Sequence, residues 1–240
     1  MNLFETSRGT MTLDERCSVI VVARLGSHRF PRKALASIQG SSIVEIITSR
    51  LHRHFGHVGS VVLATSTEES DDDLARVGRS IGLHVFRGSE HDVMDRVASA
   101  GEEVGCEVLV RANGDSPMIE PGLIDEALLQ LRQHDLDFVS SRGNQRLPYG
   151  VGVELIRLET LRRLHETANE VAREHVTLAA YESAEIRRGY LDCDHWPSAP
   201  DIRLTVDTPA DLERIRGIVT TSGQQVHDFH YWHISRSNYQ

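Results

Sequence analysis

Long apolar runs and clustered cysteines are both missing from this sequence of 240 residues. No stretch approaches the ~18 consecutive apolar residues of a membrane span, and no charged and apolar signal pattern stands at the N-terminus. The three cysteines, Cys17, Cys106 and Cys193, lie far apart, without a CxxC motif or Cys/His ligand spacing. We therefore expect a cytoplasmic protein with reduced, buried thiols and no membrane segment.

An excess of positive charge is also absent. The chain has 26 basic and 35 acidic residues, which gives a formal net charge of -9. This balance argues against a protein that covers nucleic acid or an anionic membrane, so any anionic partner must be held by a local basic cluster. Lysine is nearly absent, because Lys33 is the sole lysine and arginine fills every other basic position.

The length of 240 residues and the hydrophobic content of 40% suit one large α/β domain. The chain is too short for two full-sized domains. We expect a flexible leader at 1–16, a single domain at 17–218 and a C-terminal tail at 219–240. Short apolar runs alternate with helical patterns, which is typical of a mainly parallel, doubly wound sheet with helices on both faces. Strands are expected at 18–23, 61–65, 84–86, 107–112 and 138–141, and helices at 43–55, 72–81, 92–104 and 121–134.

The regular alternation stops after Ser141. Residues 142–190 are interpreted as an insertion that forms an acceptor wall or a dimer contact, with LIRLETLRRLHE and VAREHVTLAAYE as helices and RRGYLDC as a strand. A late strand is expected at 203–206, followed by a helix whose cap is Thr208 and whose first residue is Pro209. Parallel strands place their carboxyl ends at one edge, where ligands bind.

A cluster of basic residues lies in the loop ARLGSHRFPRKAL, which follows the first predicted strand. Arg24, Arg29, Arg32 and Lys33 lie within ten residues, and Gly26 and Ser27 allow the backbone N–H groups to approach an anion. Such a loop provides the local positive charge that a triphosphate needs. Taken alone, the cluster is also compatible with a solvated basic loop.

Five ordered segments carry a more specific signal. They are ARLGSHRFPRKAL, FRGSEHDVMDR, VRANGDSPMI, REHVT and RLTVDTPADL, and the resemblance that they carry covers about 17–218. This pattern resembles the SpsF-type cytidylyltransferases of spore-coat polysaccharide biosynthesis and, more distantly, the CMP-KDO and CMP-sialic acid synthetases. The resemblance implies a Rossmann-like, GT-A-type nucleotidyltransferase fold, a homodimer, and transfer of CMP from CTP to an acidic sugar.

The resemblance also implies roles for individual residues. Arg24 and Lys33 contact the phosphates with Arg29 nearby, and further nucleotide contacts come from Ala23, Leu25, Gly26, Ser27, Arg87, Ser89, Asp92, Arg111 and Gly114. Ser89 and Asp92 also fit a plain helix start, with Ser89 as the cap, and Arg111 could instead form an internal ion pair. The acceptor pocket receives Tyr149, Glu154, Glu174 and His175.

Asp115 and Asp207 each follow a predicted strand, so both can meet at the same edge of the sheet. Two carboxylates together with triphosphate oxygens are a common way to hold Mg²⁺, although either aspartate alone could be a turn or cap residue. With the family pattern behind them, we predict that Asp115 and Asp207 bind Mg²⁺ and act with Arg24 and Lys33 in catalysis.

The pattern departs from the family on the acceptor side. YGVGVELI retains Glu154, but Gly152 and Tyr149 stand at positions where the family usually has aspartate, and Leu178 replaces a usual proline. Four functions remain open: a cytidylyltransferase for an acidic sugar or a related carboxylate or phosphonate, a nucleotidyltransferase that uses another nucleoside triphosphate or a sugar 1-phosphate, a GT-A glycosyltransferase, and a non-catalytic nucleotide-binding homologue.

Overall fold

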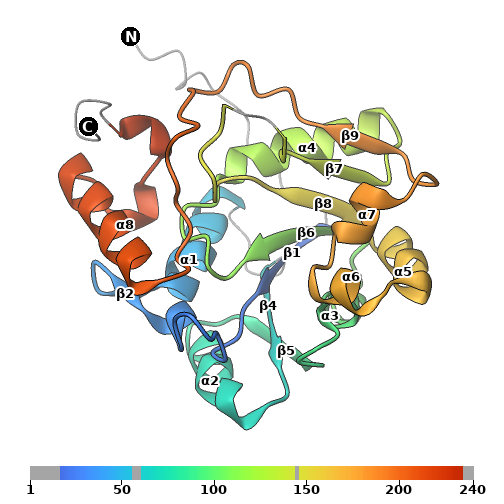
Figure 1. Cartoon of the computed structure of the whole chain (residues 1–240), viewed down its shortest axis with the longest axis horizontal. Helices are drawn as coiled ribbons and strands as arrows, with labels where there is room; N and C mark the ends of the chain where they lie inside the picture. Colours follow the sequence, from blue (N-terminus) through green and yellow to red (C-terminus); the bar gives the residue numbers. More distant parts are fainter. Residues whose placement is uncertain (1–16, 56–60, 144–145, 235–240) are drawn as a thin grey trace.

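The computed structural model describes residues 17–55, 61–143 and 146–234, so the predicted leader lies outside the described residues. In these ranges seven strands form one sheet in the order β5-β4-β1-β6-β8-β7-β9 (Figure 1). The strands are β1 (Cys17–Val22), β4 (Val61–Ser66), β5 (His84–Gly88), β6 (Val108–Asn113), β7 (Phe138–Ser140), β8 (Glu154–Arg157) and β9 (Arg188–Tyr190). A separate hairpin pairs β2 (Ser37–Ile38) with β3 (Ser41–Ser42).

Helices surround this sheet. They are α1 (Ile43–Phe55), α2 (Asp72–Ser80), α3 (Val93–Glu103), α4 (Pro121–Gln133), α5 (Leu158–Thr167), α6 (Glu170–Glu174), α7 (Leu178–Glu182) and α8 (Pro209–Ser222). Strands β5, β4, β1 and β6 are parallel, whereas β8 runs antiparallel to both β6 and β7. A mostly parallel sheet between helices confirms the predicted α/β class.

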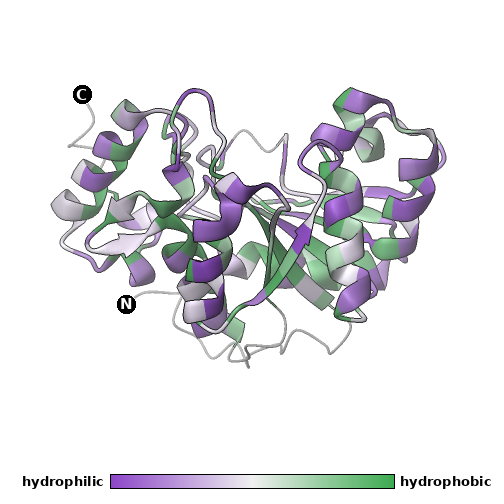
Figure 2. Cartoon of the chain, turned by 90° about the horizontal axis from the view of Figure 1, so that it is seen from below, coloured by the Kyte–Doolittle hydropathy of each residue, from purple (hydrophilic) through white to green (hydrophobic). Residues whose placement is uncertain are grey.

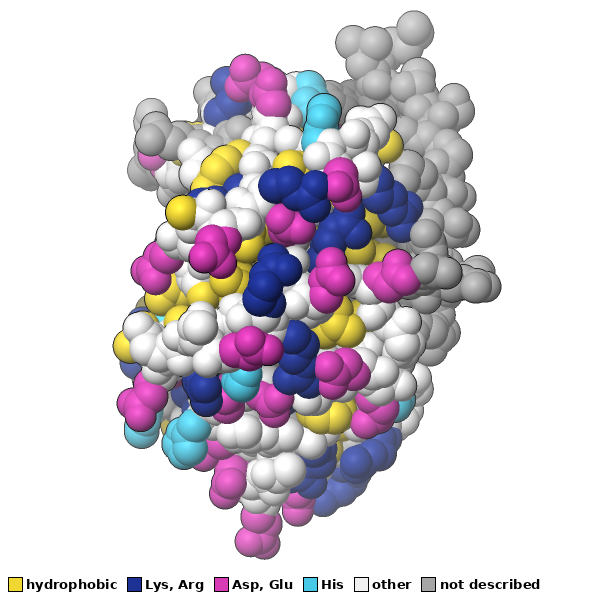
Figure 3. Space-filling view, turned by 90° about the vertical axis from the view of Figure 1, so that its right-hand side faces the viewer, with side chains coloured by type: hydrophobic (Ala, Val, Ile, Leu, Met, Phe, Trp, Pro, Cys, Tyr) yellow, Lys and Arg dark blue, Asp and Glu magenta, His cyan; other side chains and the backbone are white. Residues whose placement is uncertain are grey.

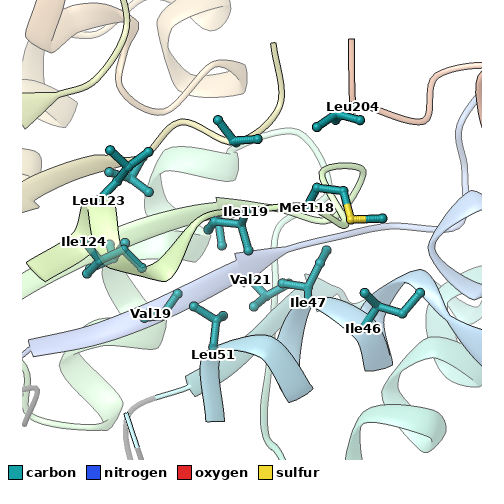
Figure 4. Close-up of a cluster of buried hydrophobic side chains, with 14 of the residues drawn as sticks. Val19, Val21, Ile46, Ile47, Leu51, Met118, Ile119, Leu123, Ile124 and Leu204 are labelled. Carbon is teal, nitrogen blue, oxygen red and sulfur yellow. The ribbon is translucent and has the colours of Figure 1, made fainter. Parts of the chain in front are cut away.

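Alternate side chains of β1 belong to two separate hydrophobic clusters. Val19 and Val21 pack with α1, α4 and α8, as the close-up in Figure 4 shows for α1 and the start of α4. Ile20 points to the opposite face and packs with apolar residues of α3 and α5. A strand buried on both faces needs apolar residues at successive positions, which explains the unbroken run VIVV at 19–22. Figure 2 shows the hydrophobic strands lying between the helices.

The chain after α8 packs against the body of the protein, although it was predicted as a tail from residue 219. Residue 219 lies inside α8, and Phe229 and Tyr231 are almost fully buried. The buried guanidinium of Arg50 on α1 donates hydrogen bonds to the carbonyl oxygens of Ile119 and Phe229. Arg50 therefore connects this C-terminal segment to the N-terminal end of α4.

Two predicted elements are wrong. Residues 155–157, predicted as the start of a helix, belong to β8 in the middle of the sheet, and the helix begins only at Leu158. The predicted strand at 203–206 pairs only through an isolated bridge between Arg203 and Tyr149. Its end nevertheless lies beside β6, because the Val206 N–H donates to the Asp115 carbonyl oxygen over 2.8 Å. Hydrophobic period alone did not distinguish a four-residue buried strand from the first turn of a helix.

A tight turn at Val176 divides the predicted helix over VAREHVTLAAYE into α6 and α7. Val176 has a φ of 53°, and the Thr177 N–H donates to the His175 carbonyl oxygen over 2.6 Å, an i to i+2 bond. A β-branched residue rarely adopts positive φ, and such backbone costs on the order of 1–3 kcal/mol. This strained turn lies next to the pocket described below.

The surface shows no large region of one charge on the face in Figure 3, where basic and acidic side chains alternate over the described residues. In the described ranges, no helix has the length and apolar character that crossing a bilayer requires. The mixed charges on this face agree with the absence of an excess of positive charge in the sequence.

Candidate active site

A pocket of about 350 Å³ opens at the carboxyl ends of β1 and β6. The loop after β1, the N-terminal part of α3, the end of β6 and the end of α6 form its walls. Its lining comprises Val22, Ala23, Arg24, Ser27, His28, Arg29, Lys33, Ala34, Val93, Arg96, Arg111, Asn113, Gly114, Asp115, Glu174 and His175. This is the edge of the sheet at which open α/β folds bind ligands.

Backbone hydrogen bonds hold the loop that follows β1. The Leu25 N–H donates to Oδ1 of the buried Asp71 over 2.6 Å, and the Arg32 N–H donates to the Leu25 carbonyl oxygen over 2.9 Å. Arg32 then adopts a left-handed φ of 61°, and a short 3-10 helix begins at Lys33. This turn directs Lys33 back toward the pocket, whereas Arg32 points away and pairs with Asp73.

Lys33 joins the two predicted metal ligands. Its Nζ donates to Asp115 Oδ2 over 2.9 Å and to Asp207 Oδ1 over 3.2 Å. The three side chains are only 15%, 30% and 15% exposed, respectively, so the charges are partly shielded from water. Asp115 and Asp207, which are 82 and 174 residues from Lys33 in the sequence, therefore converge on one cation.

Close backbone packing positions Asp115. Its neighbour Gly114 donates its N–H to the Val22 carbonyl oxygen over 2.8 Å, and a Cβ at residue 114 would lie only 2.5 Å from the Ala23 Cβ. A side chain at residue 114 would separate the ends of β1 and β6. Glycine is thus required for Asp115 to reach the loop that carries Lys33.

Three basic side chains contact the carboxylate of Asp207. Arg29 lies 3.0 Å away, Lys33 lies 3.2 Å away and Arg203 lies 2.8 Å away. Burial opposes ionisation of Asp207, but the hydrogen bond from Arg203 and the charge of Lys33 outweigh it and lower the pKa of the carboxyl group. Asp207 is therefore an anion at neutral pH.

Arg24 lies on another wall of the same pocket. Its guanidinium is 3.5 Å from Glu90 and 3.7 Å from Glu174, so it connects the segment before α3 to the end of α6. His175 follows Glu174 and lines the pocket because the strained turn at Val176 ends α6 there. Both exposed residues of the REHVT segment thus face the cavity that Arg24 borders.

Glu154 lies under the pocket wall and holds Arg111. The carboxylate accepts hydrogen bonds from Arg111 Nη1 over 2.9 Å, from the Thr177 hydroxyl over 2.7 Å and from the Tyr181 hydroxyl over 2.6 Å. Burial raises the pKa of Glu154, but the Arg111 charge and these hydrogen bonds outweigh it, so the pKa is lowered. Arg111 therefore both forms an internal ion pair and lines the pocket, which combines the two alternatives left open by the sequence.

The two unusual residues of the YGVGVE segment have different surroundings. Tyr149 is 61% exposed, and its ring lies 4.5 Å from the Arg203 guanidinium. A Cβ at residue 152 would lie 2.6 Å from the Ser141 hydroxyl, which itself accepts a hydrogen bond from the Val153 N–H. In this chain Ser141 therefore occupies the space that an aspartate at residue 152 would need.

Five predicted nucleotide-binding residues do not line the pocket, namely Leu25, Gly26, Arg87, Ser89 and Asp92. Arg87 donates to the carbonyl oxygens of Ser66 and Glu68 and pairs with Asp72. Asp92, rather than Ser89, caps α3 by accepting from the Asp95 N–H, while Ser89 accepts from the Asp92 N–H.

Asp92 has a structural function. It pairs with His165 of α5 and with Arg173 of α6, so that it connects three helices. Arg96, at the end of the same FRGSEHDVMDR segment, lines the pocket although it was not among the predicted site residues. The only available signal was its place on the helix three residues after Val93.

Other acidic and histidine-rich segments lie elsewhere. Asp194 of the Asp192-Cys193-Asp194 sequence is 79% exposed and pairs with Arg146. His54 pairs with Asp125 and His230 with Glu120, while His57 lies outside the described residues. Among the described residues, no group of three His, Cys, Asp or Glu side chains is arranged to hold a metal ion. Any metal near Asp115 and Asp207 would need further ligands from its substrate.

The fold and the pocket define the class of protein. Two carboxylates that converge on one lysine, beside a basic loop after the first strand, are typical of a nucleotide-binding α/β protein. A solved cytidylyltransferase from Leptospira borgpetersenii has the same fold, with a TM-score of 0.82 and 24% identity over 91% of this chain and 92% of the other.

The family follows from the sequence comparisons. The family model for cytidylyltransferases matches residues 18–233, and the chain belongs to that family. It is 31% identical over 218 residues to an uncharacterized protein of Methanocaldococcus jannaschii, covering 88% of each chain.

Two relatives with named functions also match. The chain is 29% identical over 212 residues to the spore coat polysaccharide biosynthesis protein SpsF of Bacillus subtilis, covering 86% of this chain and 87% of SpsF. It is 39% identical over 119 residues to the 3-deoxy-manno-octulosonate cytidylyltransferase of Geobacter sulfurreducens, covering 49% and 46% of the two chains. These matches confirm the predicted relationship to the SpsF-type family.

Proposed function

We propose that this protein transfers CMP from CTP to an acidic sugar, or to a related carboxylate or phosphonate, and releases pyrophosphate. The observation that carries the proposal is the contact of Lys33 with both Asp115 and Asp207, beside a pocket that Lys33, Asp115 and the basic loop line. Family membership supports cytidine as the nucleoside, and the octulosonate relative supports an acidic sugar as the acceptor.

In the proposed reaction an acceptor oxygen attacks the α-phosphorus of CTP, the bond from that phosphorus to the β-phosphate bridge breaks, and pyrophosphate leaves with the bonding electrons. Such reactions depend mainly on positioning and on neutralising the charge of the phosphate oxygens. Arg24, Arg29 and Lys33 provide cationic groups around the pocket. Lys33, a compact charge on a flexible stem, can leave the carboxylates and follow a phosphoryl group.

The residues at this edge fit Mg²⁺. Asp115 and Asp207 already converge on one cation, and both are anionic hard-oxygen ligands of the kind that Mg²⁺ takes together with phosphate oxygens. When bound, the ion would neutralise charge on the triphosphate and orient it. Asp115 and Asp207 would hold it, while Lys33 and Arg29 bind the phosphates.

The pocket lining gives less support to the alternatives. A glycosyltransferase would need its D-x-D carboxylates at the pocket, whereas Asp194 lies on an exposed loop and pairs with Arg146. A non-catalytic homologue has no need to keep Lys33, Asp115 and Asp207 together. The cytoplasmic location and the homodimer remain predictions.

The test is pyrophosphate release from each of the four nucleoside triphosphates with Mg²⁺ and a panel of sugar acids, sugar 1-phosphates and phosphonates. We expect release with CTP and an acidic acceptor. Release with a sugar 1-phosphate alone, or only with another triphosphate, would replace this proposal with the second alternative. Tight CTP binding without release for any acceptor would favour the non-catalytic homologue.

A further inference from the structure

Asp71 is a buried carboxylate outside the pocket that contacts the basic loop. It ends a short 3-10 helix directly before α2, is 1% exposed and does not line the pocket. Its position is that of a helix cap, yet among the described residues its side chain makes no capping hydrogen bond. Oδ1 instead accepts the Leu25 N–H over 2.6 Å. Capping of α2 therefore does not account for this buried group.

Leu25 is the residue at which the basic loop closes. Its carbonyl oxygen accepts the Arg32 N–H over 2.9 Å, while its own N–H donates to Asp71, so both of its backbone groups are paired. Its side chain is buried as well. Between Leu25 and Arg32, residues 27–29 line the pocket. Asp71 thus anchors the base of a loop whose outer part forms a wall of the pocket.

The other oxygen of the same carboxylate is bound to the end of β4. Oδ2 accepts from the Ser66 N–H over 3.3 Å and from the Ser66 hydroxyl. Ser66 is the last residue of β4, and β4 pairs directly with β1. Asp71 therefore connects the base of the loop to the central sheet. Loss of the carboxylate would leave the buried Leu25 N–H without its acceptor, which is unfavourable.

The negative charge of Asp71 is offset on the side of the pocket. Burial lowers the pKa of Arg96 to about 10, and the charge of Asp71 opposes this effect. Arg96 lines the pocket, so a positive group lies between the ligand space and the influence of Asp71. A carboxylate can thus hold the loop without repelling an anionic ligand.

A second aspartate of the same acidic run contacts the loop from outside. Asp73 pairs with the Arg32 side chain over 2.8 Å, and the two side chains are 41% and 56% exposed. Ion pairs exposed to this degree contribute little, because water screens them. Asp71, in contrast, holds the loop backbone from the interior.

We propose that Asp71 is a positioning residue for the donor triphosphate, which fixes the base of the basic loop before the nucleotide binds. This inference rests on the proposed use of a nucleoside triphosphate. An anchored loop loses less conformational freedom when the ligand arrives, so its affinity is higher. Arg24, next to Leu25, and residues 27–29 are the groups that the anchor holds in place at the pocket.

Titration calorimetry with CTP and with inorganic triphosphate, both with Mg²⁺, tests this assignment. Asp71→Ala removes the acceptor of the Leu25 N–H, so both ligands should bind about 10- to 100-fold more weakly than to the wild type. Asp71→Asn keeps one acceptor oxygen for the two backbone donors and should give intermediate affinities. Ser66→Ala is the matched control, because it removes a hydrogen bond to the same carboxylate but leaves that of Leu25. It should lower the urea midpoint of unfolding and keep both affinities.

Hydrogen exchange of the ligand-free protein tests the anchor itself. After correction for intrinsic rates, the Leu25 amide of the wild type should exchange at least about 100-fold more slowly than the amide of the exposed Gly26. The Asp71→Ala protein should lose this protection, whereas the Ser66→Ala protein should retain it.

Four results would overturn the assignment. The first is equal exchange of the Leu25 and Gly26 amides in the wild type, a measurement that needs no variant. The second is wild-type affinity for both ligands in a folded Asp71→Ala or Asp71→Asn protein. The third is an equal loss of affinity in Ser66→Ala, which would indicate general destabilisation. The fourth is a loss for CTP but not for inorganic triphosphate, which would place the effect on the nucleoside. Absence of CTP binding by a wild-type protein with a protected Leu25 amide would instead contradict the proposed function.

Discussion

Lys33 Nζ lies within hydrogen-bond distance of Asp115 Oδ2 and of Asp207 Oδ1, at 2.9 and 3.2 Å. One ammonium group therefore compensates two carboxylates that would otherwise repel each other across the pocket. The same two carboxylates are the proposed Mg²⁺ ligands. When a metal and a triphosphate bind, the metal would take the place of the Lys33 ammonium between the carboxylates. The phosphates would then attract the ammonium. The sole lysine of the chain thus lies in contact with both carboxylates.

Exchange of Lys33 for arginine tests this interpretation, because the charge is kept and the shape is changed. A planar guanidinium is bulkier than an ammonium and cannot take the same position between the two carboxylates. We expect Lys33→Arg to lower kcat/KM for CTP by a factor of about 100, as measured by pyrophosphate release. Arg32→Lys is the matched control, since Arg32 pairs with Asp73 outside the pocket and should keep full activity. Unchanged turnover of Lys33→Arg would show that the shape of Lys33 is irrelevant.

Removal of either carboxylate charge should abolish turnover without unfolding the protein. Asp115→Asn and Asp207→Asn keep the side-chain size but remove an anionic ligand, so we expect pyrophosphate release to fall by at least about 100-fold. Circular dichroism should confirm that both variants fold. Asp194→Asn removes an exposed carboxylate of the D-x-D sequence and should have no effect. Retained turnover in an Asp115 or Asp207 variant would remove that residue from the metal site.

The contact between Gly152 and Ser141 predicts a coupled effect on stability. A Cβ at residue 152 would lie 2.6 Å from the Ser141 hydroxyl, so Gly152→Ala should cost about 1–3 kcal/mol of unfolding free energy. In a Ser141→Ala background the hydroxyl is gone, and the same exchange should cost less. Urea unfolding of the four proteins measures the coupling. Additive costs would mean that Ser141 does not limit the space at residue 152.

The lowered pKa of Glu154 predicts acid sensitivity. A carboxyl group with a folded-state pKa below its ordinary value of 4.5 stabilises the protein above that pH, and this stability is lost as the pH falls through the folded-state pKa. The free energy of unfolding should therefore decrease between about pH 5 and pH 3. Glu154→Gln should be less stable by ~1–3 kcal/mol at neutral pH, and its unfolding free energy should decrease less steeply with acid. An identical pH dependence in the variant would contradict the assignment of this effect to Glu154.

Much of the fold could be predicted because the residues of its parallel strands are buried on both faces. The unbroken run around Ile20 allowed β1 to be located, and the cap formed by Thr208 and Asp211 defined the start of α8. The short strand β8 was missed because its residues are followed directly by the amphipathic helix α5. The split between α6 and α7 was also missed, because nothing in the sequence marks Val176 as a residue with positive φ.

Only part of the candidate site could be predicted from the sequence, because tertiary contacts decide which side chains face the pocket. Asp115 follows β6, and Asp207 follows Val206, whose N–H bonds the Asp115 carbonyl oxygen, so both chain segments end side by side at one edge of the sheet. Arg87 and Arg96 belong to one segment, yet only Arg96 lines the pocket, because Arg87 is held by Ser66, Glu68 and Asp72. Which arginine of a segment faces a cavity depends on tertiary partners that local sequence does not identify.

The most direct test of nucleotidyl transfer follows the label of radioactive CTP in the presence of Mg²⁺ and an acidic acceptor that supports pyrophosphate release. With label on the α-phosphate, the account predicts that radioactivity moves to the acceptor; with label on the γ-phosphate, it predicts that radioactivity appears in pyrophosphate. The Asp115→Asn protein should give neither product. Formation of CDP, or γ-label in orthophosphate or on the acceptor, would contradict cleavage between the α- and β-phosphates and with it the proposed function.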